Sequence, residues 1–270
     1  MTTMTVLEEV DCVPFVKWIG GKRSVINHLK ENLPSFNSYH EPFVGGGALF
    51  FAEGYRHTGC ISDVNPELIN AYSVVKDNPA DLISELGVHS KKNEESYYYK
   101  VRASKPRSKV RRAARLIYLL RTCFNGLYRE NSKGGFNASW GFYKNPNITQ
   151  EDNIMACSEA LQHTEICHQP CWDNNPDSGD FVYFDPPYYD SYTQYNANQF
   201  NEADQVRLRD MAVRLHEGGV SVMLSNSDNE FVRNLYSGSM FTLRQVYAKR
   251  TVSRKSSSRG PEAELLITTY

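Results

Sequence analysis

The stretch EPFVGGGALF, residues 41–50, follows a short run typical of a strand and leads into a run typical of a helix. Its three glycines, Gly45, Gly46 and Gly47, permit positive φ angles and allow a ligand to approach the backbone closely. The helix that follows offers unpaired N–H groups and partial positive charge at its start. A strand, a glycine turn and a helix in this order favour an α/β fold with a ligand at the turn.

Strands and helices alternate on both sides of an irregular, basic middle region. We expect strands within 39–42, 59–65, 164–170, 181–184 and 220–228, and helices near 22–32, 66–78, 79–86, 148–161 and 201–219. The last two strands, within 241–252 and 263–270, are expected to pair as an antiparallel hairpin. The pattern predicts an α/β domain, residues 1–72 and 152–270, interrupted by an inserted domain, residues 73–151, of helices and a hairpin.

Composition narrows the class of protein. The 270 residues carry a net charge of −1 and an ordinary globular share of apolar and charged residues. Because no long apolar run and no basic-then-apolar start are present, we expect neither a membrane span nor a signal peptide, and a cytoplasmic location. The six cysteines are scattered without the spacing of a zinc site, so reduced thiols and no metal are expected.

The distribution of charge is more informative than its sum. Between Lys91 and Lys133 there are thirteen Lys or Arg residues against three acids. Between Arg244 and Arg259 there are six Lys or Arg residues and no acid. A single basic run is commonly a solvated face, but two runs beside a candidate active site favour contact with a nucleic acid.

The stretch FVYFDPPYYD, residues 181–190, ends a predicted strand abruptly. Proline cannot donate to a strand ladder, and ligands of open α/β sheets bind beyond the carboxyl ends of the strands. Asp185 and the carbonyl of Pro186 are two acceptors that suit an exocyclic amino group, and Tyr188 offers a face for a planar base. An amine held by two acceptors gains electron density, so it can attack an electrophilic methyl group.

A second acid favours a nucleoside-type cofactor. Asp63 ends the next predicted strand, sixteen residues after Gly47, which suits a carboxylate that accepts hydrogen bonds from ribose hydroxyls. The turn lacks the full G-x-G-x-x-G pattern, because position 50 is Phe, so a single nucleoside fits better than a dinucleotide. Upstream, the stretch FVKWIGGKRS supplies a flat ring, room and a cation at Trp18, Gly20, Gly21 and Lys22.

These motifs together resemble the Dam-type family, the alpha group or D12 class, of N6-adenine DNA methyltransferases. The resemblance runs from about Phe15 to the end of the chain. It is carried, in the order of the family, by KWIGGK, EPFVGGGALFF, DVNPELINAY, FNGLYREN, GGFNASWGFYKNP, FDPPY and KRTVSRKSSSRGPEAELL. A DPPY motif alone recurs among many amino methyltransferases, whereas the whole ordered set is specific.

The resemblance implies a Rossmann-like methyltransferase domain with a mixed seven-stranded sheet, and S-adenosylmethionine as cofactor. It implies cofactor binding by Trp18, Gly20, Gly21, Lys22, Glu41, Pro42, Phe43, Gly45, Gly47, Asp63, Val64 and Asp185. It implies catalysis on the target base by Asp185, Pro186, Pro187 and Tyr188. It implies contact with double-stranded DNA by Lys17, Arg121, Asn125, Gly126, Leu127, Arg129, Asn131, Lys144, Arg250 and Ser253.

The resemblance further implies methylation of adenine in GATC or a related short site, with Arg129 reading a guanine edge. Its bacterial or phage setting leaves room for a cognate restriction endonuclease that acts on the same site. One departure bears on specificity, because relatives close to the enterobacterial enzyme read NVPFGRYKNP where this chain has NASWGFYKNP. Ser139, Trp140 and Phe142 thus replace Pro, Phe and Arg, and loss of the arginine affects phosphate contact or base preference.

Other functions stay open from the residues alone. Cytosine also presents an exocyclic amine, so an N4-cytosine methyltransferase is the nearest alternative. A methyltransferase of RNA or of a protein amide shares the cofactor sheet, although the basic insert argues against a protein substrate. A sequence-specific DNA-binding protein without catalysis is the third, and its expected sign, a disrupted DPPY or glycine turn, is absent from this sequence.

Overall fold

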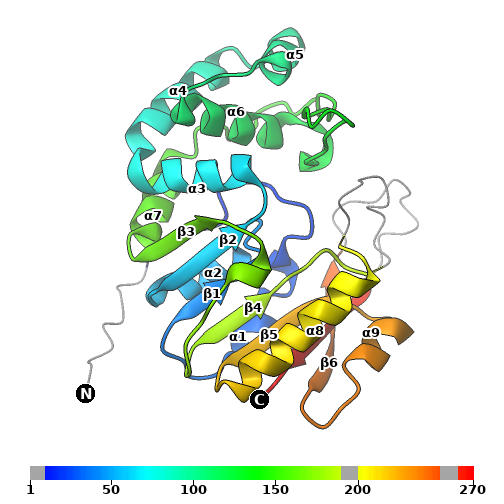
Figure 1. Ribbon diagram of the computed structural model, residues 1–270. Coiled ribbons are helices and arrows are strands. Elements are labelled where there is room, and N and C mark those ends of the chain that lie inside the picture. Colours follow the sequence, from blue (N-terminus) through cyan, green and yellow to red (C-terminus); the bar gives the residue numbers. More distant parts are fainter. Residues whose placement is uncertain (1–9, 190–199, 250–260) are drawn as a thin grey trace.

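The computed structural model describes residues 10–189, 200–249 and 261–270. Seven strands form one sheet in the order β3-β2-β1-β4-β5-β7-β6 (Figure 1). They are β1 (Tyr39–Glu41), β2 (Gly59–Asp63), β3 (Thr164–His168), β4 (Phe181–Phe184), β5 (Ser221–Ser227), β6 (Thr242–Lys249) and β7 (Pro261–Thr268). Strands β3 to β5 in this order pair in parallel, whereas β7 runs antiparallel to both of its neighbours. The predicted mixed sheet and its C-terminal hairpin are confirmed.

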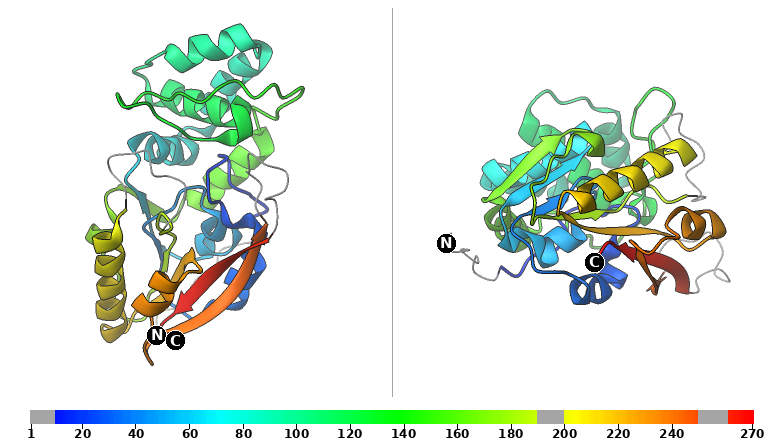
Figure 2. Two further views of the ribbon diagram at one scale, coloured as in Figure 1. Left: turned by 90° about the vertical axis from the view of Figure 1, so that its right-hand side faces the viewer. Right: turned by 60° about the horizontal axis from the view of Figure 1, so that its bottom comes forward.

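The central strand β4 is buried on both faces, as its continuous apolar run FVYF predicts. Phe181 and Tyr183 join a core cluster that includes Leu49 of α2 (Ala48–Ala52). Val182 and Phe184, which point to the other face, join a second cluster that includes Leu208 of α8 (Glu202–Glu217). The sheet therefore has a helical layer on each face, as the two views of Figure 2 show.

Five further helices gather at one end of the sheet, toward the top of Figure 1. They are α3 (Pro66–Asp77), α4 (Pro79–Lys91), α5 (Glu95–Ala103), α6 (Lys109–Thr122) and α7 (Glu151–Leu161). Helix α6 is the amphipathic centre of this group and packs against α3, α4 and α5. The expected domain boundary at 73 falls within α3, and that at 151 is the first residue of α7, so α3 and α7 link the two regions.

The segment after α6 folds back on itself as an irregular hairpin. Its two arms meet at antiparallel bridges between Cys123 and Trp140 and between Glu130 and Phe136. No continuous strand forms in this described segment. Asn125, between the two bridges, has a positive φ angle of 56°, which departs from strand geometry, and Phe142, beyond the outer bridge, has the same angle. The hairpin expected from the sequence is present, with a less regular backbone than a strand pair.

Several helix bounds differ from the expected ones. Helix α4 continues to Lys91 instead of ending at Leu86, because Gly87 lowers helix propensity without forcing a stop. The expected helix near 22–32 is divided into a 3₁₀ turn, Lys22–Ser24, and α1 (Ile26–Glu31). Helix α9 (Glu230–Leu235) was not expected, although Asn229 caps it by accepting from the Val232 N–H at 2.9 Å.

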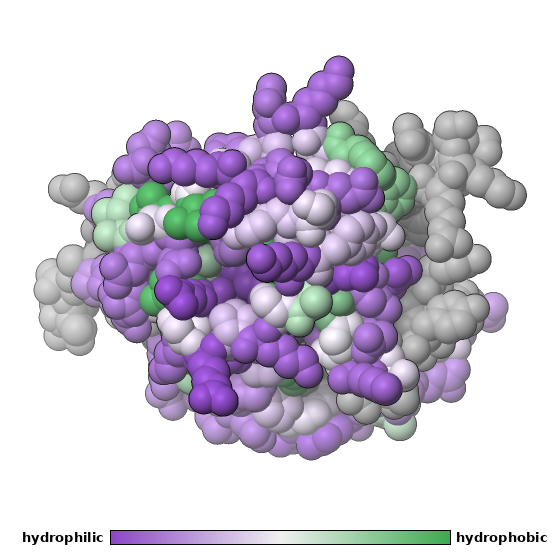
Figure 3. Space-filling view, turned by 90° about the horizontal axis from the view of Figure 1, so that it is seen from above, coloured by the Kyte–Doolittle hydropathy of each residue, from purple (hydrophilic) through white to green (hydrophobic). Residues whose placement is uncertain are grey.

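Three further 3₁₀ turns lie in the connections, at Gly54–Arg56, Phe124–Gly126 and Cys171–Asp173. Within the described residues, none of the helices combines the length and the apolar character needed to cross a membrane. Seen from the end formed by α4, α5 and α6, the surface is mainly hydrophilic with a few apolar side chains (Figure 3).

Candidate active site

The loop that carries Gly45, Gly46 and Gly47, called the glycine loop below, lies across the carboxyl ends of β1 and β2. The N–H of Val44 donates to the carbonyl of Ser62 at 3.0 Å, and the N–H of Gly45 donates to Asp63 Oδ2 at 3.1 Å. The second carboxylate oxygen, Oδ1, accepts from the N–H of Asn65 at 2.9 Å. Burial raises the pKa of Asp63, and these backbone hydrogen bonds oppose the rise. Asp63 thus fixes the loop, and each oxygen keeps a lone pair for a ligand hydroxyl.

Two of the glycines are required by their surroundings. A Cβ at Gly45, where φ is +47°, would lie 2.9 Å from Cδ1 of Trp18. A Cβ at Gly47, where φ is +68°, would lie 2.6 Å from the hydroxyl of Tyr72, which donates to the Gly45 carbonyl at 3.1 Å. The predicted need for small residues here is therefore steric as well as conformational.

Trp18 connects the glycine loop to the hairpin. One edge of its ring faces Gly45, and its ring centroid lies 4.9 Å from that of Tyr128 in the hairpin. Gly20 has a positive φ of 79° and open space beside it, while Gly21 lies close to the Trp18 carbonyl. Trp18 and the two glycines are accordingly brought to the mouth of the glycine loop.

Lys22 is the central cation of the site. Its side chain is only 5% exposed, and its Nζ lies 2.9 Å from Asp185 Oδ1 at the end of β4. The same Nζ donates to the Gly20 carbonyl at 2.7 Å and lies 4.8 Å from the ring centroid of Tyr188. The sequence separates Lys22 from Asp185 by most of the chain, and the sheet brings them together.

Two buried carboxyl groups flank Lys22. Burial raises the pKa of Glu41 to about 8, although a hydrogen bond from the Tyr39 hydroxyl at 2.7 Å opposes the rise. Burial also raises the pKa of Asp185 to about 6; the charge of Lys22 opposes this rise and that of Glu264 adds to it. At neutral pH Glu41 is therefore mainly protonated, whereas Asp185 is mainly ionised and can accept hydrogen bonds from an amine.

This charge balance predicts a pH dependence. Because protonation removes the negative charge with which Asp185 accepts a hydrogen bond from the target amine, kcat/KM should fall as pH drops through about 6. Lys22→Met removes the nearby positive charge, so the pKa of Asp185 rises and the acid limb moves to higher pH. Glu264→Gln removes a negative charge and should move the limb to lower pH. Shifts of equal sign in the two variants would contradict the assignment of Asp185.

Tyr188 is held by the last strand. Its hydroxyl donates to Glu264 Oε2 of β7 at 2.8 Å, which orients the ring beside Asp185.

Phe43, expected to line the cofactor, is half-buried, with its ring 6.3 Å from Phe184 and 5.6 Å from Phe200. Pro42 is buried behind it, and Val64 is 64% exposed after β2.

A buried polar network fixes the turn that carries Asp185. Gln205 of α8, fully buried, donates to the carbonyl of Pro187 at 3.0 Å. Its own oxygen accepts from Asn226 Nδ2 of β5 at 2.9 Å, and Asn226 Oδ1 accepts from the Tyr189 N–H at 3.3 Å. Ser227 adds a further hydrogen bond to the same turn, since its hydroxyl donates to the Tyr189 carbonyl at 2.8 Å. The turn is thus held from two secondary-structure elements.

The predicted DNA-reading residues cluster in the hairpin. Arg129 is exposed, and its guanidinium donates to the side-chain and main-chain oxygens of Asn137 at 2.6 and 3.0 Å. Asn131 accepts from the N–H groups of Lys133 and Gly135, so it shapes the hairpin turn. Asn125 is exposed, Gly126 is buried against Lys17, and Leu127 is half-buried.

The other expected DNA contacts are more dispersed. Lys17 lies with its Nζ 4.6 Å from the ring centroid of Tyr143, and burial lowers its pKa. Arg121 donates to Gln150 and, at 3.0 Å, to the Phe15 carbonyl, and burial lowers its pKa to about 10. Lys144 is exposed beyond the hairpin. Arg250 and Ser253 fall outside the described residues.

Several arginines of the basic run between Lys91 and Lys133 form ion pairs or hydrogen bonds with other parts of the protein. Arg112 pairs with Glu67, and Arg111 donates to Glu85 at 3.0 Å. Arg115 donates to the carbonyl of Val101 at 3.0 Å, which ties α6 to α5. A count of basic residues in this stretch therefore overstates the number of cations that can meet a polyanion, because several of them stabilise the packing of the helices.

The three departures from the family pattern lie in different surroundings. Trp140 is buried, with its ring 5.3 Å from that of Tyr98. Ser139 is exposed, and Phe142 is 72% exposed at a positive φ of 56°. Phe142, rather than Trp140, is consequently placed where a departure alters the outer surface of the hairpin.

Gln205, Asn226 and Glu264 are functional candidates that no sequence motif predicted. Gln205 looks like an ordinary helix residue, and its partners are eighteen and twenty-one positions away. Glu264 belongs to the quoted motif KRTVSRKSSSRGPEAELL, which was the one available signal, but its contact with Tyr188 spans 76 positions.

Comparisons with known proteins find relatives that cover most of the chain. A family model described as D12 class N6 adenine-specific DNA methyltransferase matches residues 18–252. The chain is 43% identical to the Type II methyltransferase M1.LlaDCHI of Lactococcus lactis subsp. cremoris, over 97% of each chain. It is 34% identical to a DNA adenine methylase of Vibrio cholerae, over 93% of this chain and 94% of the relative. The DNA N-6-adenine-methyltransferase of Escherichia phage P1 is 32% identical, over 93% of this chain and 34% of the relative.

Proposed function

Because the chain belongs to the D12 class of N6 adenine-specific DNA methyltransferases, we propose that it methylates adenine N6 within a short site of double-stranded DNA, GATC or a close relative. The methyl donor is S-adenosylmethionine. The observation that carries the proposal is the ion pair of Asp185 with Lys22, held at the carboxyl end of β4 beside the glycine loop.

The residues of the glycine loop suit this cofactor. Asp63 has lone pairs for ribose hydroxyls, and the loop backbone beside Gly45 lies next to the half-buried ring of Phe43. When bound, S-adenosylmethionine supplies an electrophilic methyl group on a sulfonium centre. Asp185 and Glu264 together outweigh the charge of Lys22, so the site favours a cation and the positive charge that develops on the attacking nitrogen.

The target adenine is not accessible within a stacked duplex, so it must leave the helix and enter the site. Asp185 and the carbonyl of Pro186 accept its amino protons, and the ring of Tyr188 stacks on the base. The hydrogen bond from Tyr188 to Glu264 fixes the ring before the base arrives. Orientation of the amine by fixed acceptors accounts for most of the rate that the residues supply.

The exposed hairpin and the end of β4 lie on the same side of the molecule, on the right in Figure 1. The proposed assignment gives phosphate contact to Lys17 and Lys144 and base reading to the hairpin around Arg129. The division into a catalytic domain, residues 1–72 and 152–270, and a recognition domain, residues 73–151, belongs to the same proposal. So do a cytoplasmic location and a restriction endonuclease that shares the site.

The direct test uses unmethylated genomic DNA and isotopically labelled S-adenosylmethionine. Digestion of the product to nucleosides should yield labelled N6-methyl-2′-deoxyadenosine, and sequencing should place the modified adenines in one short motif. Labelled N4-methyl-2′-deoxycytidine would contradict the proposed substrate. If the modified adenines lie in a motif other than GATC, the proposed reaction stands and the proposed recognition sequence is wrong.

Arg129→Ala tests the proposed base reading. Loss of a bidentate contact to guanine should reduce discrimination against a single-base mismatch by about 1–3 kcal/mol, while non-specific binding changes little. The measurement compares kcat/KM on the cognate site and on each mismatched site. Lys133→Ala, an exposed change at the tip of the same hairpin, is the matched control. Equal losses on all sites would instead make Arg129 a phosphate contact.

A further inference from the structure

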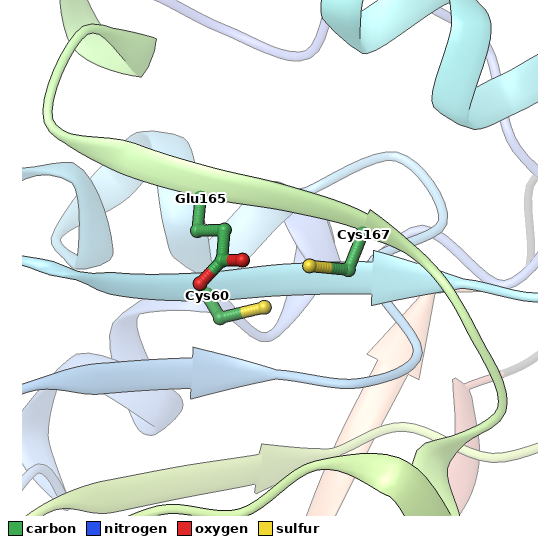
Figure 4. Close-up of side chains that lie close together, drawn as sticks. All are labelled: Cys60, Glu165 and Cys167. Carbon is green, nitrogen blue, oxygen red and sulfur yellow. The ribbon is translucent and has the colours of Figure 1, made fainter.

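Three potential metal ligands lie together at the edge of the sheet, apart from the glycine loop. Cys60 of β2 and Glu165 and Cys167 of β3 place one ligand atom each within 4.8 Å of one another. Figure 4 shows the two sulfur atoms and the carboxylate converging on one face of the two strands. Cys60 is buried, Cys167 is half-buried and Glu165 is exposed, so the cluster is open to solvent on one side.

The strand register explains why these side chains converge. Cys60 pairs with Glu165, and Ser62 pairs with Cys167, in the parallel ladder of β2 and β3. Because paired residues and residues two apart share a face, all four side chains point the same way. Ser62 is fully buried on that face, and its hydroxyl has no hydrogen-bond partner in the described part of the chain.

The spacing favours a bridging ion over a disulfide. Strands about 4.8 Å apart with a rise of about 3.3 Å per residue place the Cα atoms of a diagonal pair roughly 8 Å apart. A disulfide needs Cα atoms within about 6.8 Å, so Cys60 and Cys167 could form one only after the strands move. A tetrahedral zinc ion with bonds of about 2.3 Å holds its sulfur ligands roughly 3.8 Å apart, which suits the observed grouping.

We propose that Cys60, Cys167 and Glu165 bind one thiophilic divalent cation, zinc being the expected ion, with solvent as the fourth ligand. On binding, each thiol releases its proton to water as the metal–sulfur bond forms. The buried hydroxyl of Ser62 gains a partner by donating to the Cys167 thiolate. The ion ties the edge strand β3 to β2 immediately before Asp63. It takes no part in methyl transfer.

The proposed zinc site departs from the sequence-based expectation of no metal. Zinc motifs are recognised in a sequence by ligands that lie a few residues apart. Cys60 and Cys167 instead come from two strands that are distant in the sequence and adjacent in the sheet. The site is independent of the proposed DNA specificity, because neither the hairpin nor the DPPY turn contributes a ligand.

The test uses the full-length reduced protein, stripped with a chelator and reloaded with zinc alone. Mass spectrometry of metal content should give about one zinc per chain after removal of free ions. Cadmium in place of zinc should produce the ultraviolet charge-transfer band of cadmium thiolate, and zinc should raise the melting temperature. Cys167→Ser keeps only the Cys60 thiolate, so it should reduce the band to roughly half and weaken zinc binding at least about tenfold, the loss that follows removal of even an outer-shell partner.

Glu165→Gln alters an exposed side chain and keeps both thiols, so it should weaken zinc binding without loss of folding. Cys171→Ala, a buried cysteine next to α8, is the matched control and should bind zinc as the wild type does. A wild-type protein that retains no zinc, or a cadmium band of undiminished intensity in Cys167→Ser, would refute the site. A Cys60–Cys167 disulfide formed in place of metal binding would refute it as well.

Discussion

Asp185→Ala is expected to lower methyl transfer by about 10³-fold or more, while duplex binding stays within about threefold of the wild type. In the proposed mechanism, the change removes the acceptor that orients the target amine and stabilises the positive charge that develops on it. It also leaves Lys22 as a buried cation without its partner at 2.9 Å, so the site loses its preference for a cationic methyl donor. Single-turnover methylation and salt-matched DNA binding measure the two effects separately.

Two variants separate this role from a general loss of folding. Asp185→Asn keeps an acceptor oxygen but loses the charge, so its rate should fall between those of the wild type and Asp185→Ala. Asp210→Ala, an exposed change on α8 with an ion pair to Arg209, should leave the rate unchanged. Methylation by Asp185→Ala at the wild-type rate would remove Asp185 from the mechanism.

The second large effect is expected at Gln205, which supports the Asp185 turn and is not among the residues assigned to the substrate or the cofactor. Gln205→Ala should lower kcat by about 10²-fold with little change in KM, because a small displacement of the Asp185 turn misaligns the amine and the methyl donor. The variant removes the hydrogen bond to the Pro187 carbonyl and the partner of Asn226. Gln205 is thus a positioning residue, and a split between kcat and KM is the signature of that role.

Stability has to be measured alongside this variant. Each buried polar group left without a partner costs about 1–3 kcal/mol, so the melting temperature should fall as well. Gln162→Ala provides a matched control, since Gln162 also donates a side-chain hydrogen bond to a main-chain carbonyl, that of Lys76, but far from the site. A folded Gln205→Ala variant with unchanged kcat would show that the turn keeps its position without the network.

The local pattern of the chain was sufficient for the type and order of most elements. Glycine turns, proline stops and apolar runs act within a few residues, so β1, α2, β2 and β4 appear close to where the sequence places them. Helix α9 was missed because its six residues are too short for a helical period to stand out. The hairpin was expected, but its positive φ angles at Asn125 and Phe142 were not, because Asn adopts such angles only in a minority of cases and Phe seldom does.

The number of basic residues in the run between Lys91 and Lys133 does not show how many of them can bind DNA. The sequence shows charge but not its partner, and Arg112 and Arg115 prove to be engaged within the helical layer. The same limit explains the cysteines, which are scattered along the chain although Cys60 and Cys167 lie close together in the fold. Contacts between distant segments depend on strand order, which local residue patterns do not encode.

By itself the sequence determined the sheet-forming segments, the glycine loop, the acid at the end of β2 and the DPPY turn, because each depends on the conformational preferences of neighbouring residues. Only the tertiary structure decided which groups meet. The fold pairs Lys22 with Asp185 and brings Glu264 within hydrogen-bond distance of Tyr188. It also brings Gln205 within hydrogen-bond distance of the Pro187 carbonyl in the DPPY turn. Burial in that arrangement then sets the pKa of Asp185 at about 6, since desolvation depends on the packed surroundings and not on the residue type.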